Sequence, residues 1–146
     1  MEQTKRLTPE KRREALLEAA REVFLAHGFV GTRLDMITNK AGGSRRSIYN
    51  EFGGKDGIFV AIVEDTVKKM YVALTSIKAA PTATIREKLT TLAFSYLKVL
   101  LNPETLGLFR LVQMEYLRFP KAAQYFFEAG PDMAVSQVLE IIEQSP

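Results

Sequence analysis

Cysteine is absent from this 146-residue chain, and histidine occurs only once. Without cysteine there is no disulfide framework, no thiolate metal site and no thiol redox switch. A single histidine without cysteine also cannot build the usual zinc site. We therefore expect neither a metal nor any other cofactor.

Long apolar runs are missing as well. No stretch approaches the roughly 18 residues that cross a bilayer, and the polar start MEQTKRLTPEKRRE does not resemble a secretory signal peptide. We expect no membrane partner and a cytoplasmic location. Hydrophobic residues make up 47% of the chain and charged residues 25%, which is ordinary for a folded globular protein.

The chain also lacks the common catalytic motifs. It has no P-loop, no G-x-G-x-x-G and no nucleophile placed beside a base. His27 precedes a glycine at a predicted helix end, where it is expected to belong to the cap. Glu64 and Asp65 are adjacent, so on a helix their carboxylates point apart. The sequence therefore predicts that the chain is not an enzyme.

The net charge of +3 is small but unevenly distributed. Residues 1–55 hold 11 Lys and Arg against 7 Asp and Glu, whereas residues 56–146 hold 9 against 10. A basic first third is consistent with a surface that meets phosphate. Surface lysines that keep a protein in solution produce similar counts, so the charge alone does not decide the partner.

Three helices are predicted before residue 54. Thr8 is expected to cap the first helix, which ends at His27-Gly28. Thr32 and Ser44 are expected to cap the second and the third helix, with a glycine pair between these two.

A long fourth helix is predicted from Lys55 to about Ala80, where Pro81 stops it. Apolar residues at helical spacing continue beyond this point, and no alternating strand pattern occurs anywhere. The fold class is therefore all-α. Further helices are predicted over residues 84–101, 104–118, 121–129 and 131–144.

The run from Gly28 to Phe59, GFVGTRLDMITNKAGGSRRSIYNEFGGKDGIF, has the layout of a helix-turn-helix. Its second helix opens on Ser44-Arg45-Arg46, and in this motif the second helix enters the major groove of DNA. An arginine fork on guanine is the commonest specific contact there. The sequence therefore predicts a sequence-specific binder of double-stranded DNA.

Arg45 and Arg46 lie in the first turn of this helix, and we expect at least one of them to contact base edges. The alternative is that they neutralise phosphates or cover a solvated face. Tyr49 cannot share the face of Ile48, so its ring is expected to point outward. A phosphate near Lys55 would account for a cation at a helix start. Hydroxyls at helix starts bind phosphate or act simply as caps. The predicted DNA-binding residues are Thr32, Arg33, Ser44, Arg45, Arg46, Ser47, Tyr49, Asn50 and Lys55.

The same run resembles the TetR/AcrR family of bacterial transcriptional regulators. The resemblance covers residues 9–60, and residues 109–131 are similar, less specifically, to the regulatory domain of one branch. Two positions depart from the family pattern: Gly43 replaces an apolar residue, and Glu51 replaces an aromatic residue or histidine. The matching residues are Gly28-Phe29, Thr32, Ile37, Ala41-Gly42, Ser44, Ile48-Tyr49, Phe52, Lys55 and Phe59.

The resemblance implies a DNA-binding domain over residues 1–54 and a ligand-binding and dimerisation domain over residues 55–146. It implies an inducer pocket among the helices after the third. Family members dimerise through their last two helices and carry a further long helix, whereas this chain stops at Pro146. The chain is then either naturally short or truncated, with a different or weaker dimer contact. Most aromatic residues of the second half fit a core, but Met70, Tyr71, Phe94, Phe109, Met114 and Tyr116 are candidates for the pocket.

The predicted function is that of a transcriptional repressor. It binds a palindromic operator as a homodimer and is released by a small apolar ligand. One alternative is a helical module that binds a small molecule or a lipid without specific DNA binding. Another is a sequence-tolerant DNA binder with steep salt dependence.

Overall fold

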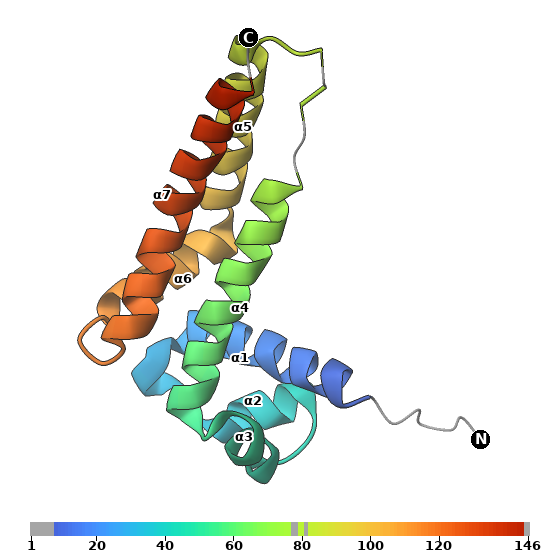
Figure 1. Ribbon diagram of the computed structural model, residues 1–146. Helices are drawn as coiled ribbons and strands as arrows, with labels where there is room; N and C mark the ends of the chain where they lie inside the picture. The colour runs from blue at the N-terminus through green and yellow to red at the C-terminus, as the bar shows by residue number, and fades with distance from the viewer. Residues whose placement is uncertain (1–7, 77–78, 81, 145–146) are drawn as a thin grey trace. The chain divides into compact units, whose positions relative to one another are not determined.

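The computed structural model describes residues 8–76, 79–80 and 82–144. Within these ranges the chain forms seven α-helices and no strand, which confirms the all-α prediction (Figure 1). None of these helices is both long and apolar enough to span a bilayer. The chain divides into two compact units, Met1–Ile62 and Val63–Pro146. The predicted boundary after residue 54 is a different kind of division, because it separates the residues expected to contact DNA from the rest of the chain. That boundary stays a prediction.

Helix α1 (Pro9–Gly31) begins where the sequence predicts. The side-chain oxygen of Thr8 accepts the N–H of Lys11 at 3.3 Å, and Pro9 occupies the first turn. Gly28 has a φ of 69°, a left-handed value that interrupts the helix before its last turn. The predicted stop at His27-Gly28 is therefore confirmed as the end of the regular helix.

Helices α2 (Leu34–Ala41) and α3 (Arg45–Phe52) form the central pair of the first unit. Ser44 caps α3 as predicted, since its hydroxyl oxygen accepts the N–H of Ser47 at 3.3 Å. The predicted cap of α2 by Thr32 is wrong: Arg33 occupies that position and forms no side-chain cap hydrogen bond. Thr32 instead closes α1, where its hydroxyl donates to the carbonyl of Gly28 at 2.7 Å.

The turn between α2 and α3 contains two consecutive glycines with positive φ. Gly42 has a φ of 76° and Gly43 a φ of 103°. A residue with a side chain rarely adopts such values. The backbone conformation therefore accounts for Gly43, one of the two departures from the family pattern.

The core of the first unit is built around aromatic rings. The ring of Phe59, from the start of helix α4 (Lys55–Thr75), lies edge-on to Phe24 at 5.4 Å and to Phe29 at 5.2 Å between centroids. Ile37 of α2 and Ile48 of α3 are also fully buried. Burying one such side chain contributes about 1.5–3 kcal/mol. Each of these short helices is therefore anchored by one apolar face.

Helix α4 ends at Thr75, so its predicted extension to about Ala80 is wrong. The hydroxyl of Thr75 donates to the carbonyl of Tyr71 at 2.7 Å, and the hydroxyl of Ser76 donates to that of Ala73 at 3.0 Å. These bonds satisfy carbonyls of the last turn and compete with helix continuation. Pro81, the predicted stop, lies outside the described residues.

The second unit also contains α5 (Ile85–Leu100), α6 (Pro103–Met114) and α7 (Pro120–Glu143). Thr84 and Glu87 form a reciprocal capping box at the start of α5, and the side chain of Asn102 caps α6. Helix α6 ends at Met114 instead of near residue 118. Gln137 of α7 donates through its amide to the carbonyl of Leu74 at 3.0 Å and thereby ties α7 to the last turn of α4.

Helix α7 continues through Gly130 and Pro131, so the predicted division into helices 121–129 and 131–144 is wrong. Pro131 has no N–H, and the carbonyl of Phe127 therefore cannot accept the usual hydrogen bond from that residue. Phe126 and Met133, on either side of this gap, are buried. Their packing keeps the helix continuous despite the missing hydrogen bond.

Candidate nucleic-acid interface

Helix α3 has two distinct faces. Ile48 is fully buried, whereas Arg45, Arg46, Tyr49 and Asn50 are exposed. Tyr49 is 59% exposed, which confirms the prediction that it points outward. One short helix therefore presents two guanidinium groups, a phenol and an amide on a surface backed by a rigid apolar core.

Arg45 and Arg46 differ in their surroundings. The Nη2 atom of Arg45 lies 3.7 Å from a carboxylate oxygen of Asp35 on α2. Arg46 has no ion-pair or hydrogen-bond partner within the described part of the chain. Arg46 can therefore reach a ligand without breaking a contact, whereas Arg45 must exchange a contact with Asp35.

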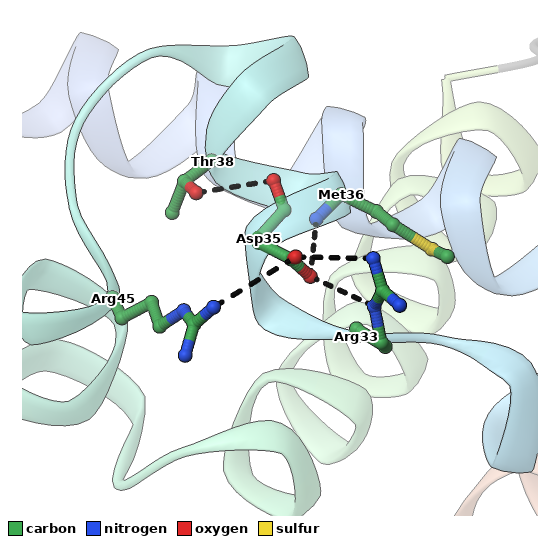
Figure 2. Close-up of polar contacts among 5 residues, drawn as sticks. All are labelled: Arg33, Asp35, Met36, Thr38 and Arg45. Carbon is green, nitrogen blue, oxygen red and sulfur yellow. Dashed lines mark hydrogen bonds and ion pairs between the residues drawn. The ribbon is translucent and has the colours of Figure 1, made fainter.

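Asp35 also binds Arg33, the residue two positions before it (Figure 2). The Nε and Nη2 atoms of Arg33 each donate to one carboxylate oxygen at 3.2 Å. The N–H of Met36 adds a further bond at 3.1 Å. The Arg33 hydrogen bonds, followed by the charges of Arg33 and Arg45, hold the pKa of Asp35 below its ordinary value of 3.8. The carboxylate is therefore ionised at neutral pH and organises two of the predicted DNA-binding arginines.

The start of α3 carries the two predicted serines. Besides accepting the Ser47 N–H, the Ser44 hydroxyl lies 3.2 Å from the Ser47 hydroxyl. No acidic residue occupies the first turn of this helix. Its N-terminal end thus combines exposed N–H groups, hydroxyls and arginine side chains, the groups that proteins use to hold phosphate.

Lys55 has its own contacts within the protein. Its Nζ atom lies 3.4 Å from the carbonyl oxygen of Val30 and 4.6 Å from the ring centroid of Phe29. A carbonyl and an aromatic face both favour a cation. The structure therefore offers an explanation for Lys55 at the start of α4 that needs no phosphate.

Thr32 differs from the other candidates because its side chain is inaccessible. It is 1% exposed, and its hydroxyl donates to Gly28. Its contact with DNA stays a prediction, and the buried hydroxyl argues against it.

The ring of Tyr49 lies close to Gly54. A Cβ atom placed on Gly54 would lie 3.0 Å from Cε1 of Tyr49, and the φ of Gly54 is 116°. Glycine at this position therefore permits both the backbone conformation and the position of the ring.

Two ion pairs connect α1 to the helix-turn-helix. Arg13 pairs with Glu51 at 3.3 Å and also lies over the ring of Phe52, 5.2 Å from its centroid. Lys40 of α2 pairs with Glu22 of α1. Glu51, the second departure from the family pattern, thus has a structural partner that motif comparison could not reveal.

The six predicted pocket residues of the second unit are not brought together. Met70 and Phe109 line a cavity of about 450 Å³, and Tyr71 lines a separate, wider hollow of about 1170 Å³. Phe94, Met114 and Tyr116 are exposed and line neither. Tyr96, Phe126 and Phe127 also line the smaller cavity, although the sequence analysis left them among the core aromatic residues, because helical spacing alone does not reveal which apolar faces converge. No cluster of three or more potential metal ligands occurs among the described side chains.

Two known families match the sequence. Residues 16–62 match the family described as "Bacterial regulatory proteins, tetR family", and residues 87–145 match "AefR-like transcriptional repressor, C-terminal domain". The first match contains the whole helix-turn-helix, and the second covers α5 to α7 almost completely.

Curated relatives match only part of this chain. The HTH-type transcriptional repressor AcnR of Corynebacterium glutamicum is 32% identical over 62 residues, which is 42% of this chain and 33% of AcnR. The HTH-type transcriptional regulator RutR of Escherichia coli K12 is 31% identical over 78 residues, covering 52% and 37% of the two chains. The matched segments thus span about a third of the length of these relatives.

Solved structures share the fold over almost the whole chain. A protein from Mesorhizobium loti described as a TetR-family transcriptional regulator has a TM-score of 0.76 at 22% identity, covering 94% of this chain and 69% of that one. The Flavonoid-responsive Regulator FrrA has a TM-score of 0.71 at 24% identity, with coverages of 92% and 68%.

These matches agree with the prediction of a regulator and not an enzyme, and they do not favour a ligand-binding module without DNA binding. The chain belongs to the TetR family of bacterial transcriptional regulators.

Proposed function

We propose that this chain is a cytoplasmic transcriptional repressor that binds a palindromic operator as a homodimer and is released by a small apolar ligand. The observation that carries the proposal is the exposed face of α3, where Arg45 and Arg46 project from the first turn while Ile48 anchors the opposite side. A helix held in this way can enter the major groove without losing its own packing.

The two arginines have different roles in this proposal. Arg46 reads a base edge, because no described residue of the protein engages its guanidinium. Arg45 is held near Asp35 until DNA offers it a stronger acceptor. A fork on guanine is worth about 1–3 kcal/mol of discrimination against the wrong base.

The remaining contacts fix the position of the protein on the duplex. The hydroxyls of Ser44 and Ser47 and the N–H groups beside them bind phosphate at the start of α3. Further contacts along the sugar-phosphate backbone of the DNA come from the exposed Tyr49 hydroxyl, Asn50 and Arg33. Lys55 adds positive charge nearby, although the Phe29 ring and the Val30 carbonyl already engage it.

Dimerisation follows from the geometry of DNA. Two α3 helices must lie about 34–36 Å apart to enter successive major grooves on one face of the duplex, which requires an inverted repeat. A ligand releases the operator only if it binds better to a conformation with the wrong spacing. Helix α4 is continuous from Lys55 to Thr75 and contains residues of both units. We therefore propose that α4 transmits the effect of ligand binding in the second unit to the position of α3.

Selection of bound duplexes from a random DNA pool at about 150 mM salt tests the proposal. We expect enrichment of an inverted repeat, and loss of that enrichment in an Arg45→Ala/Arg46→Ala variant. An Arg110→Ala/Lys121→Ala variant removes the same charge from the second unit and should select the same repeat. A pool without any enriched sequence would contradict specific binding, and enrichment of a single half-site would contradict the dimer.

A further inference from the structure

Two ion pairs connect α3 to the neighbouring helices within the described part of the chain. Arg45, three positions before Ile48, lies 3.7 Å from Asp35 of α2. Glu51, three positions after Ile48, pairs with Arg13 of α1 at 3.3 Å. With 3.6 residues per turn, positions 45 and 51 lie about 60° to either side of Ile48 on the helix circumference. The two ion pairs therefore flank the face through which α3 packs on the core.

The packing of α3 leaves its rotation weakly defined. The helix has eight residues, and Ile48 is the buried one among them. Apolar contacts are non-directional, so a single buried side chain fixes the depth of a helix better than its rotation about its own axis. An ion pair on each flank opposes rotation, because a turn in either direction lengthens one of the two pairs. The flanking pairs thus determine which side of α3 faces outward.

The rotation of α3 controls where Arg46 points. Arg46 lies about 160° from Ile48 around the helix and is exposed. A rotation of about 10° displaces an atom at a radius of about 6 Å by about 1 Å. Hydrogen bonds between nitrogen and oxygen have lengths of about 2.7–3.2 Å, so such a displacement decides whether the bond forms. The discrimination of bases by Arg46 therefore depends on the rotation of α3.

Arg13 is well placed to fix this rotation. Its guanidinium pairs with Glu51 and also lies over the ring of Phe52, 5.2 Å from the ring centroid. An arginine can stack on an aromatic ring while it pairs with a carboxylate, and the ring then holds the guanidinium in place. Leu16 and Leu17, one turn further along α1, are buried. The helix that carries Arg13 is thus itself anchored in the core.

The two flanking pairs behave differently when DNA binds in the proposed function. Arg45 exchanges its contact with Asp35 for a contact with DNA, so the pair on that flank is lost. Glu51 lies about 140° from Arg46 around the helix, and its pair with Arg13 therefore faces away from the Arg46 side chain. Among the described residues, the Arg13–Glu51 pair is then the one that still connects α3 to another helix.

We propose that Arg13 is a positioning residue for operator recognition. Through Glu51 it fixes the rotation of α3 and thereby directs Arg46 at a base edge, and it does not itself contact DNA. Its role in recognition rests on the proposed function, whereas its hold on α3 does not. The proposal also gives a function to Glu51 at a position where the family pattern has an aromatic residue or histidine.

The ratio of the affinities for the selected operator and for a scrambled duplex of the same length tests this role. A change in net charge affects both duplexes alike, and partial unfolding lowers both affinities by one factor. We expect Arg13→Gln and Glu51→Gln each to lower the ratio about 3- to 10-fold. Loss of the Glu51 charge alone would instead strengthen binding to both duplexes. The control Arg12→Gln removes a neighbouring exposed charge and should keep the ratio within about 2-fold of the wild type.

A double-mutant cycle tests whether Arg13 acts through Glu51. The double variant Arg13→Gln/Glu51→Gln should lower the ratio no more than about 2-fold beyond the weaker of the two single variants. Arg13→Gln should also keep the salt dependence of operator binding, because a lost phosphate contact would reduce its slope by about 1. Losses that multiply in the double variant, or a reduced slope, would show that Arg13 binds DNA directly and would overturn the proposal.

Amide hydrogen exchange without DNA measures the hold of Arg13 on α3. In Arg13→Gln the amides of α3 should exchange at least about 3-fold faster, whereas Arg12→Gln should match the wild type. Unchanged exchange in α3 or an unchanged affinity ratio would each overturn the proposal. A wild-type protein that prefers no duplex, with faster exchange of α3 in Arg13→Gln, would contradict the proposed function but not the hold of Arg13 on α3.

Discussion

The carboxylate of Asp35 lies 3.7 Å from the guanidinium of Arg45, across the turn that joins α2 to α3. The same carboxylate holds Arg33 through two bonds of 3.2 Å (Figure 2). An acidic residue thus lies within the most basic part of the proposed DNA-binding surface. We infer that it restricts Arg45 and disfavours loose phosphate binding, and that it thereby increases the difference between operator and other DNA.

The exchange Asp35→Asn tests this role. Removal of the negative charge should strengthen binding to non-operator duplexes and lower the ratio of operator to non-operator affinity by about 10-fold. Glu14→Gln makes the same charge change at an exposed position of α1 and should leave the ratio unchanged. Both ratios follow from fluorescence anisotropy titrations. An unchanged or higher ratio in Asp35→Asn would show that Asp35 does not contribute to discrimination.

The pKa of Asp35 predicts a pH dependence of stability. Because Arg33 and Arg45 lower this pKa in the folded state, the ion pairs stabilise the protein above the unfolded value of 3.8 and are lost as the pH falls through the folded value. Denaturant titrations should show a difference between the wild type and Asp35→Asn that is constant from about pH 7 to pH 5 and shrinks below about pH 4. A difference that grows on acidification would contradict the assigned pKa direction.

Ser44 allows its cap to be separated from its proposed phosphate contact. Asp caps a helix as well as Ser does, so Ser44→Asp should retain the stability of α3, but its charge should weaken operator binding about 10-fold or more. Ser44→Ala should instead lower the free energy of unfolding by about 0.5–2 kcal/mol. Thermal unfolding and operator titration measure the two effects. Full operator affinity in Ser44→Asp would exclude a phosphate at this end of α3.

Replacement of Gly54 by alanine is predicted to lower the free energy of unfolding. Its φ of 116° and the 3.0 Å distance that would separate an added Cβ atom from the Tyr49 ring both oppose Gly54→Ala, which should destabilise the protein by about 1–3 kcal/mol. Gly31→Ala is the matched control, because a Cβ atom there meets only an ordinary contact of 3.5 Å with His27. We expect the control to stay within about 0.5 kcal/mol of the wild type. Equal effects in the two variants would contradict this explanation of Gly54.

In the first unit, residue types at the helix ends predicted most helix boundaries correctly. The caps Thr8 and Ser44 and the break at Gly28 depend on nearby backbone geometry, which residue type reveals directly. The role of Thr32 was predicted wrongly because a threonine between two helices can cap the end of the first helix as well as the start of the second. Asp35 was missed for a different reason: its contact with Arg45 requires the turn conformation, which sequence spacing does not specify.

The second unit depended more on tertiary packing. Gly130-Pro131 is a strong local break, yet the buried Phe126 and Met133 keep α7 continuous. The predicted pocket contained Met70 and Phe109, which line the smaller cavity, but left Tyr96, which also lines it, among the core aromatic residues. Helical periodicity indicates which residues share a face, and it does not indicate which faces meet.

The central claim is that the first turn of α3 reads the base sequence. The most direct test is to titrate the Arg45→Ala/Arg46→Ala variant with the selected operator and with a scrambled duplex of the same length. We predict that the two affinities become equal while the circular dichroism spectrum keeps its helical content. A variant that still prefers the operator as strongly as the wild type would contradict the claim.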